Sequence, residues 1–150
     1  MLGRLTEAEQ ATWQVVMSAN TKLLERLDHQ LQQRSQLSLT DYEILSGLEK
    51  SQDKRLRMSE LADRVLVSRS RLTYRIDRLV GVGYVAREEC PDDRRGLFAI
   101  LTPFGSEALR AAMPGHVEDI RGWFIDLLDP GELEVLERVF QRMDEKLAIN

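Results

Sequence analysis

The chain has 150 residues, of which 43% are hydrophobic and 31% are charged, and this is the composition of a soluble globular protein of about one domain. No apolar run approaches the roughly 20 residues that a membrane-spanning helix needs, the first residues lack the apolar segment of a signal peptide, and the single cysteine has no partner for an intrachain disulfide. We therefore expect a cytoplasmic protein with no membrane partner.

The net charge of −4 is unevenly distributed along the chain. Residues 54–82 hold eight basic and three acidic side chains, which gives +5, and the remainder of the chain carries −9. A local basic patch, rather than the overall balance, determines the field that a phosphate backbone meets. The charge pattern therefore favours nucleic-acid binding by one part of an acidic protein.

Residues 6–33 are predicted to form one long helix. Thr6 and Glu9 have the spacing of a capping box at its start. Its apolar side chains repeat at near-heptad spacing, at Val16, Leu23, Leu27 and Leu31. A small domain cannot cover so long a helix completely, which predicts a surface for a partner.

A second helix is predicted to begin at Thr40. Thr40 and Glu43 have capping-box spacing, and Leu39 and Ile44 are placed as a hydrophobic staple. The polar segment 51–57 that follows contains one lysine and two arginines. These cations either contact phosphate or are simply solvated, and we favour solvation.

Residues 58–83 are predicted to form two short helices joined by a tight corner. Ser59 is a candidate N-cap of the first helix and Ser68 of the second. Gly83 is expected just after the second helix, because a glycine adopts positive φ without cost. The second helix has one apolar face, made by Leu72, Ile76, Leu79 and Val80.

The opposite face of this second helix carries hydroxyl and basic side chains: Ser70, Arg71, Tyr74 and Arg78, with Arg75 at its flank. The major groove of DNA admits a helix, and arginine can pair bidentately with guanine there. For this role Arg71 or Arg75 is favoured over Arg78, which lies nearer the end of the helix. An isolated helix of this kind is more often a solvated surface, but the preceding helix and the segment that follows favour DNA recognition.

Residues 84–89 and 97–101 have strand character and are expected to pair as a hairpin. The seven residues 90–96 between them contain Pro, Asp and Gly, which are typical of turns. This loop carries Arg94 and Arg95, and long loops in compact domains are often functional. A helix-turn-helix followed by a basic-tipped hairpin is a winged helix-turn-helix.

Two further helices are predicted at the C-terminus. Thr102 is a candidate N-cap, with Pro103 in the first turn, for a helix that runs to about residue 128 and is kinked at Pro114. Asp129 and Glu132 mark the start of the last helix. Its apolar seam repeats in steps of three and four, at Leu133, Leu136, Phe140, Met143 and Leu147. Both ends of the chain thus present apolar seams, which a homodimer would bury.

The central region contains a distinctive set of residues: Glu60-Leu61-Ala62, Ser68, Thr73, Asp77-Arg78-Leu79, Gly83, Val85, Arg87, Asp93-x-Arg95, Leu101-Thr102 and Gly105. In this set the sequence resembles the MarR family of winged-helix transcription regulators. The Asp-x-Arg signature of the wing, with its Leu-Thr ending, makes the match much more specific than a generic helix-turn-helix pattern.

The resemblance implies a fold that is mainly α with a small β-hairpin wing (α+β). It is a winged helix-turn-helix flanked by N- and C-terminal dimerisation helices. In these terms residues 1–150 form a single domain with a DNA-binding subdomain at 40–102, whose wing lies at about 84–101. The dimerisation helices are expected at 6–33 and 103–148.

The resemblance also implies a sequence-specific transcription regulator. It is expected to be a homodimeric repressor that binds a pseudo-palindromic operator in double-stranded DNA and is relieved by a small aromatic or anionic effector. The expected DNA-binding residues are Ser68, Arg69, Ser70, Arg71, Thr73, Tyr74, Arg75, Arg78, Asp93, Arg94 and Arg95. Arg95 is expected to contact the minor groove, with its guanidinium oriented by Asp93. The alternative is a winged-helix protein-interaction module without specific DNA binding.

Other groups of residues give little indication of catalysis, metal binding or redox sensing. No nucleophile–base pair accompanies the carboxylates, so we predict no enzyme, no catalytic residue and no cofactor. His29 and His116 are expected at helix surfaces, since two histidines and the distant Cys90 are too few for a zinc site. We favour an incidental thiol over a redox sensor for Cys90. A set of bulky side chains either lines an effector cleft or belongs to a dimer core, which we favour: Trp13, Met17, Trp123 and Phe124.

Overall fold

The computed structural model describes residues 3–65 and 69–148. Residues 1–2, 66–68 and 149–150 lie outside this description, as do the side chains of residues 69 and 93–95. The described part is mainly helical with one small antiparallel sheet, so the predicted fold class is confirmed. The chain divides after Pro114 into two compact units. Among the described helices, none combines enough length with enough apolar character to span a membrane.

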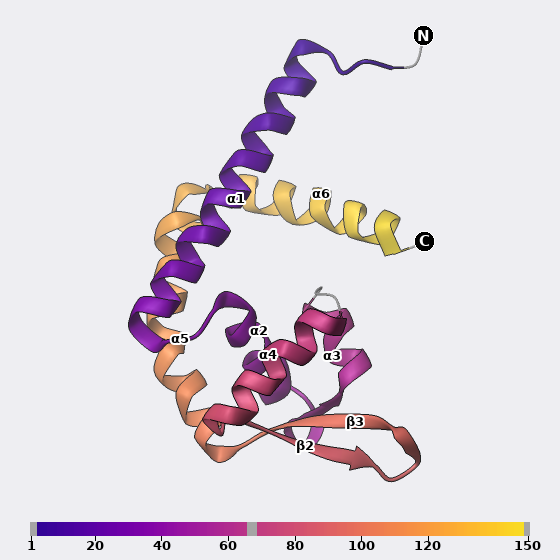
Figure 1. Ribbon diagram of the computed structural model, residues 1–150. Coiled ribbons are helices and arrows are strands. Elements are labelled where there is room, and N and C mark those ends of the chain that lie inside the picture. The colour runs from indigo at the N-terminus through magenta and orange to yellow at the C-terminus, as the bar shows by residue number, and fades with distance from the viewer. Residues whose placement is uncertain (1–2, 66–68, 149–150) are drawn as a thin grey trace. The chain divides into compact units, whose positions relative to one another are not determined.

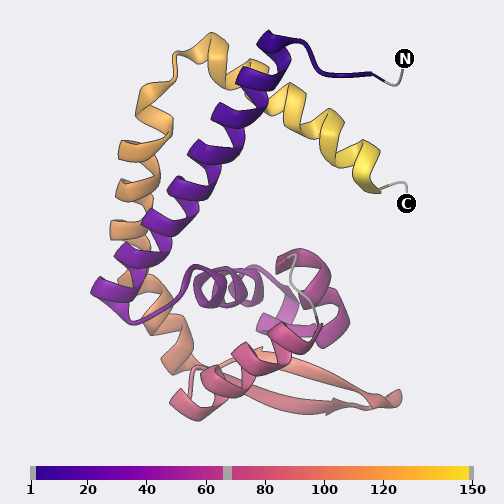
Figure 2. The ribbon, with the colours of Figure 1, turned by 45° about the horizontal axis from the view of Figure 1, so that its top comes forward.

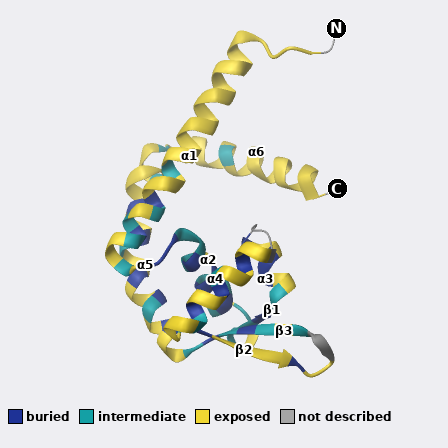
Figure 3. Cartoon of the chain, in the orientation of Figure 1, coloured by how far each residue is buried: buried dark blue, intermediate teal, exposed yellow. Residues whose placement is uncertain are grey.

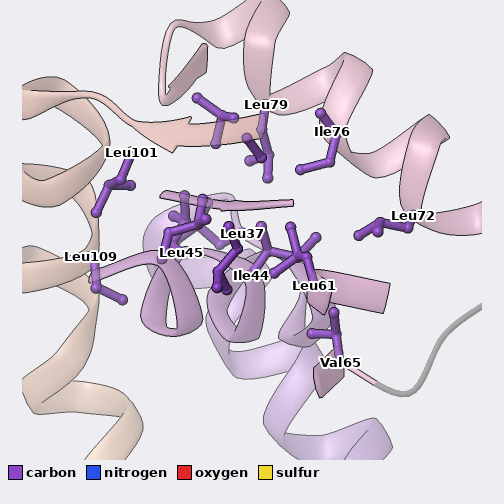
Figure 4. Close-up of a cluster of buried hydrophobic side chains, with 14 of the residues drawn as sticks. Leu37, Ile44, Leu45, Leu61, Val65, Leu72, Ile76, Leu79, Leu101 and Leu109 are labelled. Atoms are coloured by element: carbon purple, nitrogen blue, oxygen red, sulfur yellow. The ribbon is translucent and has the colours of Figure 1, made fainter. Parts of the chain in front are cut away.

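The first unit is organised around three helices, α2 (Leu39–Glu49), α3 (Met58–Val65) and α4 (Arg69–Val82), which pack with the sheet (Figures 1 and 2). Fully buried aliphatic side chains from all three meet in one cluster (Figure 4), among them Ile44, Leu45, Leu48, Leu61, Leu72 and Ile76. Burying one such side chain stabilises the fold by about 1.5–3 kcal/mol. The cluster therefore fixes which face of α4 turns inward.

The first helix, α1 (Glu7–Ser35), begins as predicted. Thr6 Oγ1 accepts the Glu9 N–H at 3.2 Å, and Glu9 Oε2 accepts the Thr6 N–H at 2.8 Å. This reciprocal pair is the capping box, and it satisfies two N–H groups that the helix itself cannot pair.

The predicted start of α2 is wrong, because the capping box is Ser38–Asp41 rather than Thr40–Glu43. Ser38 Oγ accepts the Asp41 N–H at 2.9 Å, and Asp41 Oδ2 accepts the Ser38 N–H at 3.0 Å. The Leu39 N–H donates to Asp28 Oδ1 of α1 at 2.8 Å, which supports the earlier start. That partner lies eleven residues away, so no local pattern reveals it.

The segment 51–57 is not a simple polar connector. It contains a 3₁₀ turn, Gln52–Lys54, and a short strand, β1 (Arg55–Arg57), which pairs with β3 (Asp93–Leu101) in a sheet of order β1-β3-β2. The strand forms because Leu56 alternates inward between two outward arginines. Since α3 follows β1 directly, Ser59 is the second residue of α3 and not its N-cap.

The hairpin pairs regularly where predicted, Val85 to Glu89 with Leu101 to Leu97, but its turn is shorter than the predicted loop. β2 (Val85–Cys90) and β3 are separated only by Pro91 and Asp92, and their register shifts between Glu89 and Cys90. Beyond this shift Cys90 pairs with Asp93, so residues 94–96 form an irregularity in the pairing of the two strands. Figures 1 and 2 show the hairpin extending past α3 and α4.

The end of α4 agrees with the prediction for Gly83. This residue has φ of 92°, its N–H donates to Val80 O at 3.0 Å, and the Tyr84 N–H donates to Leu79 O at 2.9 Å. These two bonds make a Schellman motif, which ends the helix and turns the chain into β2.

The predicted N-cap Thr102 connects the end of α4 to the start of the following helix. Its Oγ1 donates to Gly83 O at 2.6 Å and accepts the Gly105 N–H at 3.0 Å. The helix it starts, α5 (Pro103–Trp123), ends earlier than predicted, and a 3₁₀ turn, Ile125–Leu127, follows it. Pro114 lies inside α5, where the two units divide.

The last helix, α6 (Pro130–Ala148), starts as predicted at Asp129, whose Oδ1 accepts the Glu132 N–H at 2.8 Å. No residue of α6 is buried, and Figure 3 shows nearly all of this helix and the first half of α1 as exposed. The apolar seam predicted along α6 is thus uncovered in the single chain.

Gly105→Ala is expected to destabilise the first unit. A Cβ at this position would overlap the carbonyl oxygen of Tyr84 and lie 2.8 Å from Cδ1 of Leu101. Such overpacking typically costs about 1–3 kcal/mol, measurable by urea unfolding. Gly81→Ala in α4 is the matched control, because nothing lies within 4 Å of its Cβ position. The control should be neutral or stabilise by up to about 1 kcal/mol, and equal stability of the two variants would contradict this account.

Candidate nucleic-acid interface

The second helix of the helix-turn-helix, α4, has two chemically distinct faces. Leu72, Ile76 and Leu79 are at most 3% exposed. The outer face presents the predicted hydroxyl and basic side chains, which are exposed: Ser70, Arg71, Thr73, Tyr74 and Arg78. The structure therefore gathers these candidate residues on one accessible surface, with the apolar face fixed behind them.

Two predicted residues at the start of α4 are less completely described. Ser68 lies outside the described residues, and Arg69 is the first residue of α4 but its side chain is not described. The role of Ser68 as N-cap and the DNA contacts of both residues stay predictions.

Arg75 differs from the other candidate arginines. Its side chain is only 25% exposed, and Nη1 lies 3.8 Å from Oδ2 of the buried Asp41. The guanidinium also lies 6.0 Å from the ring centre of Tyr74. Because Asp41 closes the capping box of α2, Arg75 connects the start of α2 to α4. The sequence did not indicate this contact, because the capping-box pattern at Thr40 and Glu43 hides the role of Asp41.

Asp41→Asn tests this connection. The amide oxygen can still accept the Ser38 N–H, but the charge that attracts Arg75 is lost. We expect a loss of about 1–2 kcal/mol in the free energy of unfolding, less than for a fully buried ion pair because Arg75 is partly solvated.

The matched control for this variant is Glu43→Gln, the same chemical change on the same helix. Partial burial raises the pKa of Glu43, which means that the folded state disfavours its charged form. Replacing the carboxylate with the neutral amide should therefore cost no stability. Urea unfolding at neutral pH measures both variants. An Asp41→Asn protein as stable as Glu43→Gln would remove the structural role assigned to the Asp41–Arg75 contact.

The hairpin is held to α4 by a charged hydrogen bond, which Arg87 of β2 donates to Asp77 of α4. Both residues belong to the set recognised in the sequence, but that set did not indicate that they pair. The bond links the base of the hairpin to the exposed side of α4, although a solvated pair of this kind adds little stability. The two surfaces predicted to meet DNA are thus parts of one framework.

The predicted wing residues lie at the distal end of this hairpin. Asp93, Arg94 and Arg95 begin β3, directly after the turn, but their side chains are outside the description. The expected bond between Asp93 and Arg95 therefore stays a prediction.

Sequence reasoning missed the basic surface of β1. The guanidinium carbon of Arg55 lies 4.5 Å from the ring centre of Phe98 in β3, and that of Arg57 lies 5.9 Å from it. Lys54 Nζ lies 3.4 Å from Glu49 Oε1. These cations are therefore not simply solvated. The local signal was the alternation Arg-Leu-Arg, which at three residues is too short to predict a strand by itself.

Glu49 also ties α5 to this region. The Ser106 hydroxyl donates to Glu49 Oε2 at 2.9 Å, and Arg110 Nη2 donates to Ser106 Oγ at 3.3 Å. The hydrogen bond from Ser106, aided by Lys54 and Arg110, lowers the pKa of Glu49. The carboxylate stays charged and holds the turn before β1 in place.

The residues considered for other chemistry are placed as follows. Within the described ranges, no three or more His, Cys, Asp and Glu side chains gather as metal ligands would. His29 is exposed, but His116 is buried, which contradicts the expectation of a surface histidine. It follows Leu109 and Ala112 at helical spacing, and residue type alone did not reveal that pattern.

Cys90 is a buried free thiol at the end of β2. The side chains weighed between an effector cleft and a dimer core are all exposed in the single chain: Trp13, Met17, Trp123 and Phe124.

Comparison with known proteins gives consistent matches. Residues 35–96 match the sequence model of the MarR family. The chain is 40% identical to AbsC, a MarR family transcriptional regulator from Streptomyces coelicolor, with a TM-score of 0.93 and 99% of both chains covered. It is also 40% identical to Sco3205, a MarR family transcriptional regulator from the same organism whose structure is in complex with DNA. That match has a TM-score of 0.95 and covers 98% of this chain and 92% of the other.

A curated relative is more distant. The HTH-type transcriptional repressor YetL of Bacillus subtilis is 29% identical over 113 residues, which cover 75% of this chain and 67% of YetL. The match with the two Streptomyces coelicolor structures therefore extends over more of the chain than the match with this repressor.

Proposed function

Because the chain belongs to the MarR family of transcription regulators, we propose that it binds a pseudo-palindromic operator in double-stranded DNA as a homodimer. The observation that carries this proposal is the two-faced helix α4, whose hydroxyl and basic side chains are exposed opposite a fully buried apolar face. A transcription regulator of this kind is not an enzyme. Residues 40–102 would read DNA, and residues 6–33 and 103–148 would form the dimer.

The recognition helix is the proposed source of sequence preference. In a helix-turn-helix the second helix enters the major groove and presents its side chains to base edges. Arginine there reads guanine, while serine, threonine and tyrosine hydroxyls bond bases or phosphates. We assign these roles to the exposed residues of α4 and to the predicted residues beside them, Ser68 and Arg69.

The dimer is supported by apolar surface that the single chain leaves uncovered. In α6, Leu133, Phe140 and Met143 are between 43% and 48% exposed, and Leu147 is 67% exposed. In α1, Trp13 is 59% exposed. Monomeric proteins rarely leave contiguous apolar surfaces of this kind in water. Two copies would also present two recognition helices to half-sites about one helical turn apart.

We infer that the regulator represses transcription and that a small aromatic or anionic ligand relieves it. Family membership supports this inference, as does the name of the repressor YetL. The test is the melting temperature and the operator affinity of the protein in the presence of aromatic carboxylates. A ligand that relieves repression must bind the DNA-free form more tightly than the DNA-bound form. It should therefore raise the melting temperature and lower the operator affinity.

DNA binding itself is tested by fluorescence anisotropy. Operator sequences are first selected from random duplexes, and the affinity for the selected duplex and for random DNA is then measured over a range of salt concentrations. A sequence-specific regulator should prefer the selected duplex by a factor of about 10³ or more. Failure to bind any duplex at low salt would favour the alternative, a winged-helix protein-interaction module.

The wing is expected to contribute affinity more than specificity. Arg95 would enter the minor groove, where a narrow A·T-rich groove has a strongly negative potential. Arg95→Ala should therefore weaken binding to operator and random DNA alike, and flatten the plot of log affinity against log salt by about 0.9 for each charge removed. Arg94→Ala is the control and should do less, since Arg94 is not part of the Asp-x-Arg signature. An Arg95→Ala protein that binds as tightly as the parent at moderate salt would exclude the wing contact.

A further inference from the structure

A second basic surface lies away from the outer face of α4. A cavity of about 470 Å³ opens between the end of α2, the 3₁₀ turn, β1 and the start of α3. Four cations line it: Lys50, Arg55, Arg57 and Arg64. Two carboxylates, Asp53 and Glu60, also line it, so its net charge is positive. We call it the β1 groove.

The two arginines of β1 are held side by side on one aromatic ring. Both guanidinium groups lie within 6 Å of the ring centre of Phe98, at 4.5 Å for Arg55 and 5.9 Å for Arg57. Cation–π attraction of this kind orients a guanidinium without neutralising it. Among the side chains that the structure describes, neither arginine has a carboxylate within ion-pair distance. Two oriented like charges thus lie together, which favours an anion between them.

The groove also adjoins the helix that crosses the DNA backbone. α3 is the first helix of the helix-turn-helix, and in such motifs the first helix crosses the phosphates while the second enters the major groove. Arg64 of α3 faces the groove, with Nη1 3.5 Å from Ser51 Oγ at its rim. The cations of β1 and α3 therefore share a side of the domain that a bound duplex would approach.

We propose that the β1 groove binds backbone phosphates of the DNA outside the bases read by α4. The inference rests on the proposed function and adds a contact surface that neither the recognition helix nor the wing supplies. A pocket for a small ligand is predominantly apolar, but Leu56 and Phe98 are the only apolar side chains among the residues that line this groove. Arginine forks match phosphate oxygens, and such contacts position a protein on DNA without reading sequence.

The test is the salt dependence of DNA binding by the full-length chain carrying Arg55→Gln and Arg57→Gln. Log affinity plotted against log salt should flatten by about 0.9 for each phosphate that the variant no longer neutralises. Affinity for operator and random DNA should fall by the same factor, so the specificity ratio should be unchanged. The single variant Arg64→Gln should show a smaller change of the same kind, and Arg64 is exposed, so its replacement does not disturb the fold.

Matched controls separate a local contact from a change in total charge. Arg4→Gln with Lys22→Gln removes the same charge from exposed residues outside the DNA-binding subdomain at 40–102. This control should leave the salt dependence of binding unchanged. Arg55→Lys with Arg57→Lys retains the charge and should retain most of the slope, because lysine also neutralises phosphate. Circular dichroism checks that each variant is folded.

Three outcomes would overturn the inference, and two of them spare the proposed function. If the parent binds no DNA, both fail. If the parent binds DNA and neither the double variant nor Arg64→Gln alters affinity or slope, the β1 groove does not bind DNA and the proposed function stands. Titration with inorganic phosphate provides a further arm. Loss of phosphate binding in the double variant with unchanged DNA binding would identify a site for free anions and overturn the proposal.

Discussion

A protein carrying Phe140→Glu and Leu147→Glu is expected to be monomeric and to bind operator DNA much more weakly than the parent. Both side chains belong to the α6 seam and are 48% and 67% exposed in the single chain. In the proposed dimer these carboxylates would be buried without partners, which is strongly unfavourable. A monomer would engage one half-site only, and the affinity that comes from linking two half-sites would be lost.

The measurement is light scattering at micromolar concentration, followed by anisotropy on the selected operator. Arg138→Glu is the matched control, because it adds a carboxylate to an exposed position of α6 that lies outside the seam. That control should remain dimeric. For the parent, the melting temperature should rise with protein concentration, as mass action requires of a dimer. A double variant that remains dimeric, or a parent that is monomeric at micromolar concentration, would contradict the assigned interface.

Local signals in the sequence predicted helix ends well where the cap and its partner are neighbours. Gly83 and Asp129 are examples, since each acts through bonds to residues at most four positions away. The apolar face of α4 was predictable for the same reason, because burial repeats with the period of the helix. These features decide which face of the recognition helix is available for DNA.

Pairing between distant residues was not predictable from local pattern. β1 is three residues long and forms because β3, more than thirty-five residues later, offers a free edge. The bond from Asp28 that shifts the start of α2 is of the same kind. Because of both errors, contacts that bear on the proposed function were missed in the sequence. The missed strand carries the cations of the β1 groove, and the missed capping residue is the partner of Arg75.

The wing agrees more closely with its prediction. Its composition indicates a loop over residues 90–96, and the regular pairing does end at Glu89 and Leu97, with one further pair, Cys90 and Asp93, after a register shift. Pairing of backbone groups is indifferent to side-chain polarity where both faces of a hairpin meet water. Arg94 and Arg95 therefore lie in an extended but irregularly paired part of β3.

Arg71→Ala is expected to cost about 1–3 kcal/mol for each operator half-site and to relax the base preference at one position. The sequence favoured Arg71 or Arg75 for reading guanine. Because Arg75 lies beside the buried Asp41 and is only 25% exposed, the exposed Arg71 is better placed for this role. The effect of removing a direct readout contact should thus be seen on operator DNA and be almost absent on random DNA, which the ratio of the two affinities measures.

Arg71→Lys distinguishes base reading from simple charge. Lysine keeps the positive charge but lacks the planar fork that forms two parallel hydrogen bonds with guanine. If Arg71 reads a base, the lysine variant should recover the salt dependence of the parent and only part of its preference for the operator. Arg78→Ala, nearer the end of α4, should leave that preference largely intact. Equal losses on operator and random DNA for Arg71→Ala, with full recovery by lysine, would mean that Arg71 contacts phosphate only. Base reading would then have to come from Arg69 or from the hydroxyl side chains of α4.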